Sequence, residues 1–289
     1  MPSTTPTPVT ILGLGAMGQA LAATLRKNDI PTTVWNRTPG KDTDLIAAGA
    51  NSAATPRTAI EASPVVIVVL LDHASVHTIL DPVVEQLAGR QVINLTSTTP
   101  EEARELASWA AGHGIDYLDG GIMAIPAMIG QPGAAIRYSG TQRVHDDNRA
   151  MLELLASAEY FGADAGIAST YDFALLSVMY GMFGGFLNGV AMLLSIGVSA
   201  QDFGVRAAAW ATAMAAAMPM EGQIIDARAY SDGGQNIYFL EAAIDAIVRA
   251  GHDAKVSQEF LTPLQNVVNR QIADGHGELS VLHTVEAIV

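Results

Sequence analysis

The chain has 289 residues, of which 49% are hydrophobic and 15% charged, so it carries enough apolar surface for two packed units and excludes extended disorder. Its formal net charge of −14 argues against nucleic acid and anionic membrane surfaces as partners, because both require cationic protein surface. The absence of cysteine excludes disulfides, thiolate nucleophiles and cysteine-ligated metal ions.

Strand-like and helix-like segments alternate through the first half of the chain. The expected strands are 9–13, 32–36, 65–71, 91–95, 115–119 and 134–138, and the expected helices are 16–27, 42–48, 75–87 and 100–113. The apolar run VVIVVLL at 65–71 is typical of a strand covered on both faces, and Thr98 or Thr99 with Glu102 is expected to cap the helix that follows. This alternation predicts an α/β Rossmann domain over residues 1–166, with a parallel sheet between two helical layers.

The second half reads as helix throughout and is predicted to form an all-α domain over residues 167–289. Its expected helices are 167–198, 201–218, 237–251, 256–274 and 279–287. The first of these, the interdomain helix, would be roughly 48 Å long at 1.5 Å per residue, and it is apolar nearly all round. A second copy of the chain is the expected cover, so we predict a homodimer.

The same apolar helix raises the question of a membrane, since about 20 apolar residues can span a bilayer. Residues 173–198 carry no formal charge, but Asp172 and Asp202 bracket them and no Lys or Arg lies near either end. We therefore expect no membrane span. Residues 1–8 have neither a basic start nor an apolar run, so no signal peptide is expected and a cytoplasmic location is predicted.

A glycine-rich segment follows the first expected strand. Gly13-Leu14-Gly15-Ala16-Met17-Gly18 matches G-x-G-x-x-G and opens a helix, which is the context that a dinucleotide site requires. Gly13 permits the tight turn, Gly15 lets the backbone approach the pyrophosphate, and Gly18 lets the helix pack on the strand. The amide groups at the helix start would then hold the phosphates.

The end of the second expected strand predicts which nucleotide binds. An NAD site places Asp or Glu there for the ribose 2′-hydroxyl, whereas this chain has Asn36, Arg37 and Thr38, with Lys41 close behind. A carboxylate would repel a 2′-phosphate, and a guanidinium can bind one through two hydrogen bonds. The sequence therefore predicts NADPH as the cofactor.

Two further loops are expected to border the cofactor, because ligands of open α/β sheets bind outside the carboxyl ends of the strands. Leu70 and Leu71 end one strand, and Asn94 and Thr96 belong to the end of the next. His73 and His77 stand four residues apart, a spacing compatible with a metal ion. No third ligand accompanies them in the sequence, so we expect no metal site.

Alcohol dehydrogenation typically uses a Lys, Tyr or His beside the nicotinamide. The chain contains only three lysines, at 27, 41 and 255, so a lysine is nearly excluded. The start of the long helix offers Asp172 and Tyr180 instead, about 12 Å apart along the axis and roughly 80° apart around it. Both could line one side of a cavity.

Four segments carry a resemblance to a known family. G-L-G-x-M-G, W-N-R-T, N-L-T-S-T-T-P and Y-D-F-A-L-L-S-x-M-Y-G are similar to the imine reductases and the reductive aminases among them, which are related to the β-hydroxyacid dehydrogenases. Those dehydrogenases carry a catalytic Lys six residues after a Gly, and counting six from Gly166 reaches Asp172. Their substrate-binding Ser is absent from the segment 119–124. Both departures point away from hydroxy acids and toward a cationic nitrogen.

The resemblance implies roles for three residues. Asp172 would hold the amine or iminium nitrogen, Tyr180 would hydrogen-bond or donate a proton, and Asn94 would orient the substrate or a water molecule near the nicotinamide. Each also has a structural reading: a charge favoured by the helix dipole, a core aromatic and a turn residue, respectively. The resemblance also implies a domain-swapped homodimer. The candidate residues for the substrate pocket are Met123, Trp210, Met214, Phe239 and Leu240.

The predicted reaction is NADPH-dependent reduction of a small imine by hydride transfer to the iminium carbon, with ketone–amine condensation as an open extension. Two alternatives remain at this point. One is a β-hydroxyacid dehydrogenase-type reductase of a small carbonyl or hydroxy acid, and the other is an NADPH-binding protein without turnover. The sequence does not indicate the natural substrate or the stereochemical preference.

Overall fold

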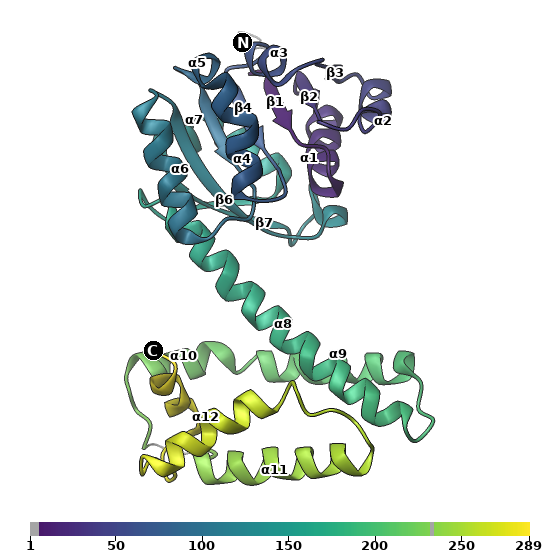
Figure 1. Cartoon of the computed structure of the whole chain (residues 1–289), viewed down its shortest axis with the longest axis vertical. Coiled ribbons are helices and arrows are strands. Elements are labelled where there is room, and N and C mark those ends of the chain that lie inside the picture. The colour runs from purple at the N-terminus through teal and green to yellow at the C-terminus, as the bar shows by residue number, and fades with distance from the viewer. Residues whose placement is uncertain (1–5, 232–233) are drawn as a thin grey trace. The chain divides into compact units, whose positions relative to one another are not determined.

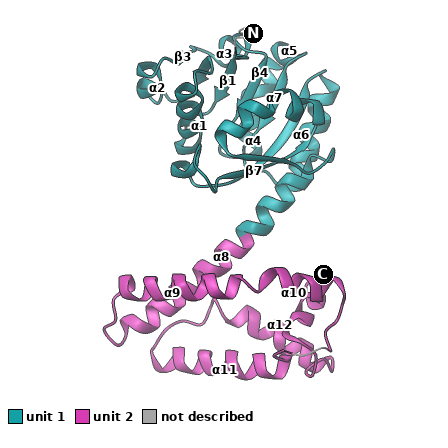
Figure 2. Cartoon of the chain, turned by 180° about the vertical axis from the view of Figure 1, so that it is seen from behind, with its two compact units in different colours: residues 1–176 teal, residues 177–289 magenta. Residues whose placement is uncertain are grey.

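A computed structural model describes residues 6–231 and 234–289, which form two compact units. Residues 1–176 make up the N-terminal unit and residues 177–289 the C-terminal unit (Figure 2). The boundary falls inside one continuous helix, α8 (Gly166–Leu194), which begins in the first unit and ends in the second.

The N-terminal unit is built on a single eight-stranded sheet in the order β3-β2-β1-β4-β5-β6-β7-β8. The strands are β1 (Val9–Leu12), β2 (Thr32–Trp35), β3 (Asn51–Ser52), β4 (Val65–Val68), β5 (Gln91–Asn94), β6 (Asp116–Met123), β7 (Ala135–Gly140) and β8 (Ser157–Tyr160). All neighbours are parallel except β6 and β7, which run antiparallel. The strand order reverses at β1 and β4, the position where open α/β sheets bind their ligands.

Helices cover both faces of this sheet (Figure 1). They are α1 (Ala16–Lys27), α2 (Thr43–Ala47), α3 (Pro56–Glu61), α4 (His73–Leu80), α5 (Val84–Leu87), α6 (Pro100–Gly112) and α7 (Gln142–Leu155). Successive residues of the central strands point to opposite faces of the sheet and belong to different hydrophobic cores. Val65 and Ile67 belong to the core that includes α1 and α7, and Val66 and Val68 to the core that includes α4 and α6. Burial on both faces explains the unbroken apolar run of β4.

The α/β class and the six expected strands are confirmed, with ends that differ by up to a few residues. The expected parallel sheet is confirmed for all pairs of neighbouring strands except one, because β7 runs antiparallel to β6. The expected helix 75–87 is divided into α4, a 3-10 turn (Asp81–Val83) and α5, since Pro82 lacks an amide hydrogen. The short strands β3 and β8 and the helices α3 and α7 were not predicted.

The expected cap of α6 is confirmed at Thr99. Its hydroxyl accepts from the Glu102 amide at 3.3 Å, and the Glu102 carboxylate accepts from the Thr99 amide at 2.7 Å. This reciprocal pair satisfies two amide groups that the helix itself leaves unpaired. The cap fixes where the chain turns after β5, beside the nucleotide-binding edge.

The C-terminal unit is helical, as predicted. It contains the second part of α8, then α9 (Ala200–Ala215), α10 (Met218–Asp226), α11 (Ile237–Asp253), α12 (Thr262–Ala273) and a 3-10 helix, η3 (Val281–Ala287). The expected helix 201–218 ends earlier, and α10 begins as a separate helix with Pro219 in its first turn. The expected helix 256–274 begins only at Thr262, with Pro263 in its first turn.

Helix α8 is the one described helix whose length and composition would also suit a membrane span, with a mean hydropathy of 1.5. Only 11% of its most apolar stretch is buried within the chain. The compact core of the C-terminal unit is small, with Ile237, Ile244 and Val268 fully covered. Many large apolar side chains of this unit therefore face outward.

Candidate functional site

A cavity of about 360 Å³ lies at the carboxyl ends of β1, β2 and β4, where the strand order reverses. It is lined by Gly13, Gly15, Ala16, Met17, Gly18, Trp35, Asn36, Arg37, Thr38, Val69, Leu70, Leu71, Ser75 and Ile79. The predicted glycine-rich segment and the predicted 36–38 segment thus line one cavity. Leu14 lies behind it, fully buried in the core.

The glycines explain how a dinucleotide fits here. A Cβ atom at Gly13 would lie 2.1 Å from the Val69 carbonyl oxygen, and one at Gly18 would lie 2.0 Å from that of Gly13. A Cβ atom at Gly15 would instead meet nothing within 4 Å, so this backbone faces the open cavity. Helix α1 begins there without a side-chain cap or an acidic first turn, which leaves its amides for the phosphates. The residues fit a pyrophosphate.

The Asn36 side chain lines the cavity and also bonds to the protein backbone. Its side-chain oxygen accepts from the Leu14 amide at 2.9 Å, and its side-chain nitrogen donates to the Thr38 carbonyl at 2.9 Å. This bridge joins the glycine-rich turn to the loop after β2. Asn36, Arg37 and Thr38 also line an adjoining cavity of about 430 Å³, and their contact with a 2′-phosphate stays a prediction. Lys41 is exposed and lines neither cavity.

The two loops expected at the nicotinamide side are connected by a hydrogen bond. The Leu70 amide donates to the Thr96 hydroxyl at 3.0 Å, and this bond links the loop after β4 to the loop after β5. Leu71 is 85% exposed, whereas Thr96 is buried. Thr96 therefore positions the loop, and Leu70 and Leu71 form the wall of the cavity.

Asp172 is the acidic group at the head of the long helix, and it is buried with 4% exposure. It lies almost two turns into α8, beyond the first turn, so the helix dipole does not account for it. Gly121 on β6 allows its approach, because a Cβ atom there would lie 2.9 Å from the Asp172 Cβ. Burial raises the pKa of Asp172 to about 6, so the carboxylate is mostly ionised at neutral pH.

Next to Asp172 lies a buried hydrogen-bond network. The Tyr117 hydroxyl donates to Asp119 at 2.9 Å, and the Ser169 hydroxyl donates to the other Asp119 oxygen at 3.0 Å. The Asn94 amide donates to the Tyr117 hydroxyl at 3.1 Å and to Asp119 at 3.4 Å. Asn94 is thus fully buried at the carboxyl end of β5, and its hydrogen bonds to Tyr117 and Asp119 fix its side chain.

Asp119 lies close enough to Asp172 for the two carboxyl groups to interact electrostatically. Burial raises its pKa to about 7, against the lowering effect of the bonds from Tyr117, Ser169 and Asn94, and the charge of Asp172 raises it further. About half of the Asp119 side chains are then protonated at neutral pH. Two carboxyl groups in one buried region create a demand for positive charge that the protein itself does not meet there.

The prediction missed Asp119, Tyr117 and Ser169 as site residues. The signal available was weak: Asp119 is the last residue of the expected strand 115–119, and Asn94 lies near the end of the preceding expected strand, 91–95. In the sheet Asn94 and Asp119 are direct partners in register. Only that pairing, together with the packing of α8, makes the network visible.

The remaining predicted residues lie on several elements. Tyr180 is on α8 in the C-terminal unit, 63% exposed, with its ring edge-to-face on Phe183. Met123 ends β6 in the N-terminal unit, and Trp210 and Met214 lie on α9, both half or more exposed. On α11, Phe239 is exposed and Leu240 packs against the small helical core. Their roles in a substrate pocket stay predictions.

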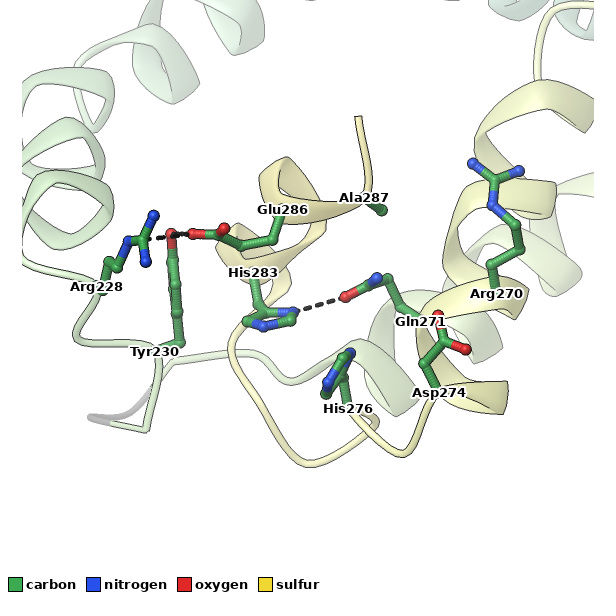
Figure 3. A pocket seen from close by; sticks show the side chains of 9 residues that line it. All are labelled: Arg228, Tyr230, Arg270, Gln271, Asp274, His276, His283, Glu286 and Ala287. Carbon is green, nitrogen blue, oxygen red and sulfur yellow. Dashed lines mark hydrogen bonds and ion pairs between the residues drawn. The ribbon is translucent and has the colours of Figure 1, made fainter. Parts of the chain in front are cut away.

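Two cavities of the C-terminal unit differ in character. An apolar one of about 560 Å³ lies between α8 and α9 and is lined by Trp210 together with Phe183, Phe186 and Phe203. A polar one of about 490 Å³ is shown in Figure 3, where the Tyr230 hydroxyl donates to Glu286 at 2.8 Å. The residues that line this second cavity come from η3, from α12 and from the segment after α10. Hydrogen bonds among their side chains connect these elements.

Two family models together match residues 8–289 of the chain. One described as "NADPH-dependent reductive aminase-like, C-terminal domain" matches residues 164–289, and one described as "NAD binding domain of 6-phosphogluconate dehydrogenase" matches residues 8–181. Among curated proteins, the chain is 38% identical over 282 residues to the NADPH-dependent reductive aminase of Aspergillus oryzae, covering 94% of each chain.

The chain is also similar to solved structures of reductive aminases and imine reductases. The reductive aminase from Aspergillus terreus in complex with NADPH4, cyclohexanone and allyl amine is 40% identical, with a TM-score of 0.93 over 99% of this chain and 100% of that one. The imine reductase from Aspergillus terreus in complex with NADPH4 and dibenz[c,e]azepine is 41% identical, with a TM-score of 0.88 over 98% and 99%.

Proposed function

This chain belongs to the family of NADPH-dependent reductive aminases and imine reductases, and from that premise we propose that it forms amines from ketones and amines, with Asp172 holding the cationic nitrogen. It is an NADPH-dependent oxidoreductase that acts on C=N bonds. The finer assignments, namely the condensation step, the residue roles and the dimer, are our proposals.

The observation that carries the proposal is the buried carboxylate of Asp172 beside a second buried acid, Asp119. An anionic substrate such as a hydroxy acid would bring a further negative charge to the buried Asp172 carboxylate, at a large desolvation cost. An amine or iminium cation would offset the charge of Asp172 and lower its pKa. The site therefore selects for positively charged nitrogen.

Each group then has a defined task. NADPH supplies the hydride. Asp172 holds the nitrogen and stabilises the positive charge that makes the neighbouring carbon electrophilic. The Asn94 side chain is fixed by Tyr117 and Asp119, so its position at the end of β5 is set before substrate binds. Tyr180 hydrogen-bonds to the nitrogen or supplies its proton.

NADPH consumption tests the reaction directly. We expect purified protein to consume NADPH with cyclohexanone and allylamine together, but not with either alone, and to release the secondary amine. If the protein promotes condensation, the rate will saturate separately with ketone and with amine. If it only reduces imine formed in solution, the rate will follow the product of the two concentrations. No NADPH consumption with any imine would contradict the proposal.

The dehydrogenase alternative is tested in the same assay with a small aldehyde acid. A relative of weaker similarity, the glyoxylate/succinic semialdehyde reductase 1 of Arabidopsis thaliana, is 26% identical over 197 residues. The lysine that the resemblance places at the head of the helix in such enzymes is Asp172 here. We therefore expect turnover of the aldehyde acid to be negligible beside that of an imine.

We also propose that the active form is a homodimer. Two observations support an interface on the C-terminal unit: many of its large apolar side chains face outward, and an apolar cavity lies between α8 and α9. The outward-facing side chains include Val178, Met182, Leu187, Leu194, Trp210, Met218 and Phe260. No Lys or Arg lies within α8 or next to its ends in the sequence, which favours a protein partner over a lipid one. Light scattering should give twice the monomer mass.

A further inference from the structure

Two histidines and one glutamate meet on the outer surface of the N-terminal unit. His73 and His77 lie one turn apart on the same face of α4, and Glu105 reaches them from α6. One Glu105 oxygen lies 2.8 Å from the His73 Nε2 and 3.0 Å from the His77 Nε2. The three potential ligand atoms all lie within 4.8 Å of one another. The sequence placed the third group 28 residues beyond the second histidine, where no spacing rule reveals it.

We propose that His73, His77 and Glu105 form a binding site for a divalent transition-metal ion such as Zn²⁺. Zinc sites take two imidazoles and one carboxylate at about 2.0–2.2 Å, which places the ligand atoms roughly 3.3 Å apart in a tetrahedron. The two separations from Glu105, 2.8 and 3.0 Å, would open by a few tenths of an ångström, and the two histidine nitrogens, which lie within 4.8 Å of each other, would approach by up to about 1.5 Å through rotation of their side chains. Imidazole ligands disfavour Mg²⁺ and Ca²⁺, which prefer oxygen.

The surroundings of His77 are those of a metal ligand. Its Nδ1 lies 3.0 Å from the Asp81 carboxylate, which can accept a hydrogen bond from Nδ1–H and so leave Nε2, the atom nearest Glu105, as the nitrogen that would bind the ion. The Trp109 ring packs edge-on against the His77 ring and restricts its rotation. Asp72 caps the start of α4 through the Ser75 amide at 2.8 Å and so fixes the helix that carries both histidines.

The site is open to solvent and separate from the nucleotide cavity. The exposed fractions of the three side chains are 24%, 22% and 51%, so water can complete the coordination of the ion. Ser75 and Ile79 on another side of α4 line the nucleotide cavity, whereas the two histidines do not. An ion here would connect α4 to α6 without touching the reacting groups.

The chain offers a matched control for the test. His113 is the C-terminal cap residue of α6, and its ring packs against Trp109, which also contacts His77. His113 is not one of the three potential ligands. His276 and His283 lie with their rings 4.4 Å apart in the C-terminal unit, so they are the competing histidine pair. Substitutions at these positions separate the proposed site from general histidine binding.

The experiment titrates tag-free, chelator-treated full-length protein with ZnCl₂ in a calorimeter and with Co²⁺ by visible absorption. We expect one ion per chain with nitrogen-ligand Co²⁺ bands, and no heat with Mg²⁺. His77→Asn and Glu105→Gln should each weaken Zn²⁺ binding at least about tenfold. His113→Asn should change it less than about twofold, with circular dichroism confirming that each variant is folded.

Three outcomes would overturn the site. They are the absence of saturable Zn²⁺ binding, unchanged Zn²⁺ affinity in folded His77→Asn, and binding that survives in His77→Asn but disappears in His283→Asn. The last result would assign the ion to the C-terminal unit. None of these results depends on the reductase activity, so the test stands apart from the proposed function.

Discussion

The two units of this chain differ in how completely they bury their own apolar side chains. The N-terminal unit encloses both faces of its sheet, and residues such as Ile11, Val66 and Leu106 are fully covered by the same chain. The C-terminal unit covers only a few residues around Ile244, and Leu187 and Trp210 remain 53% and 67% exposed. The N-terminal unit thus covers its own core, whereas the C-terminal unit exposes large apolar side chains of the kind that mark an interaction surface.

This difference separates the two parts of the function. The nucleotide cavity is lined entirely by residues of the N-terminal unit, so we expect a single chain to bind the cofactor. The predicted substrate-pocket residues lie mostly on α9 and α11 of the C-terminal unit. Cofactor binding and turnover should therefore respond differently when the partner is removed.

The largest expected effect comes from a charge placed on the exposed part of α8. Leu187→Asp should raise the dimer dissociation constant at least about 100-fold, because burying an unpaired carboxylate costs roughly 3 kcal/mol or more. Amine formation should fall with it, while NADPH affinity in the monomer stays within about threefold. Light scattering and NADPH fluorescence measure the two quantities.

Ile46 provides the matched control, since it is 48% exposed on α2 of the N-terminal unit. Ile46→Asp should alter neither the dimer nor the rate. Equal behaviour of the two variants would remove this distinction between the two units.

The next largest effect is expected at Asp172. Asp172→Asn keeps the shape of the side chain but removes its charge, so kcat/KM for an imine should fall by about 50-fold. NADPH affinity should be unchanged. Because folding raises the pKa of this carboxyl, the ionised form destabilises the fold above about pH 6, and the variant should melt at the same or a higher temperature.

A loss of thermal stability in Asp172→Asn would instead identify a structural role for the carboxylate. A normal rate of imine reduction would remove the residue from the mechanism altogether.

Arg37→Glu should act only on the cofactor and only in the N-terminal unit. Loss of a charge-assisted hydrogen bond should weaken NADPH about 30-fold, while NADH changes little because it lacks the 2′-phosphate. Fluorescence titration with both nucleotides measures this selectivity. Lys41→Glu is the companion variant, since Lys41 does not line the cavity, and its effect should be much smaller. Equal losses for NADPH and NADH would contradict the assigned phosphate contact.

The smallest effect is a pH dependence. A carboxyl with a pKa raised to about 6 is ionised above that pH and protonated below it, so kcat/KM should be about tenfold lower at pH 5 than at its plateau. An N-alkylated cyclic iminium salt should be the substrate, because its charge does not change with pH. The decline should vanish in Asp172→Asn. A profile identical in the variant would assign the titration to another group.

Much of the N-terminal unit could be predicted because its signals are local. The glycine-rich turn, the apolar strands and the cap of α6 each lie within a few consecutive residues. The antiparallel β7 could not be read in this way, since strand direction depends on how the chain returns to the sheet. Asn36 was predicted to contact the phosphate and lines the cavity, but its bonds to Leu14 and Thr38 could be seen only in the tertiary structure.

The sequence by itself determined the cofactor class, the Rossmann architecture and the presence of an acidic residue where related enzymes carry a base. These follow from residue types at short spacings. Tertiary structure alone decided which distant side chains meet: Asn94 with Tyr117 and Asp119, Gly121 with Asp172, and the two histidines of α4 with Glu105. The reason is physical, since burial and hydrogen bonding act between atoms that are close in space, whatever their separation along the chain.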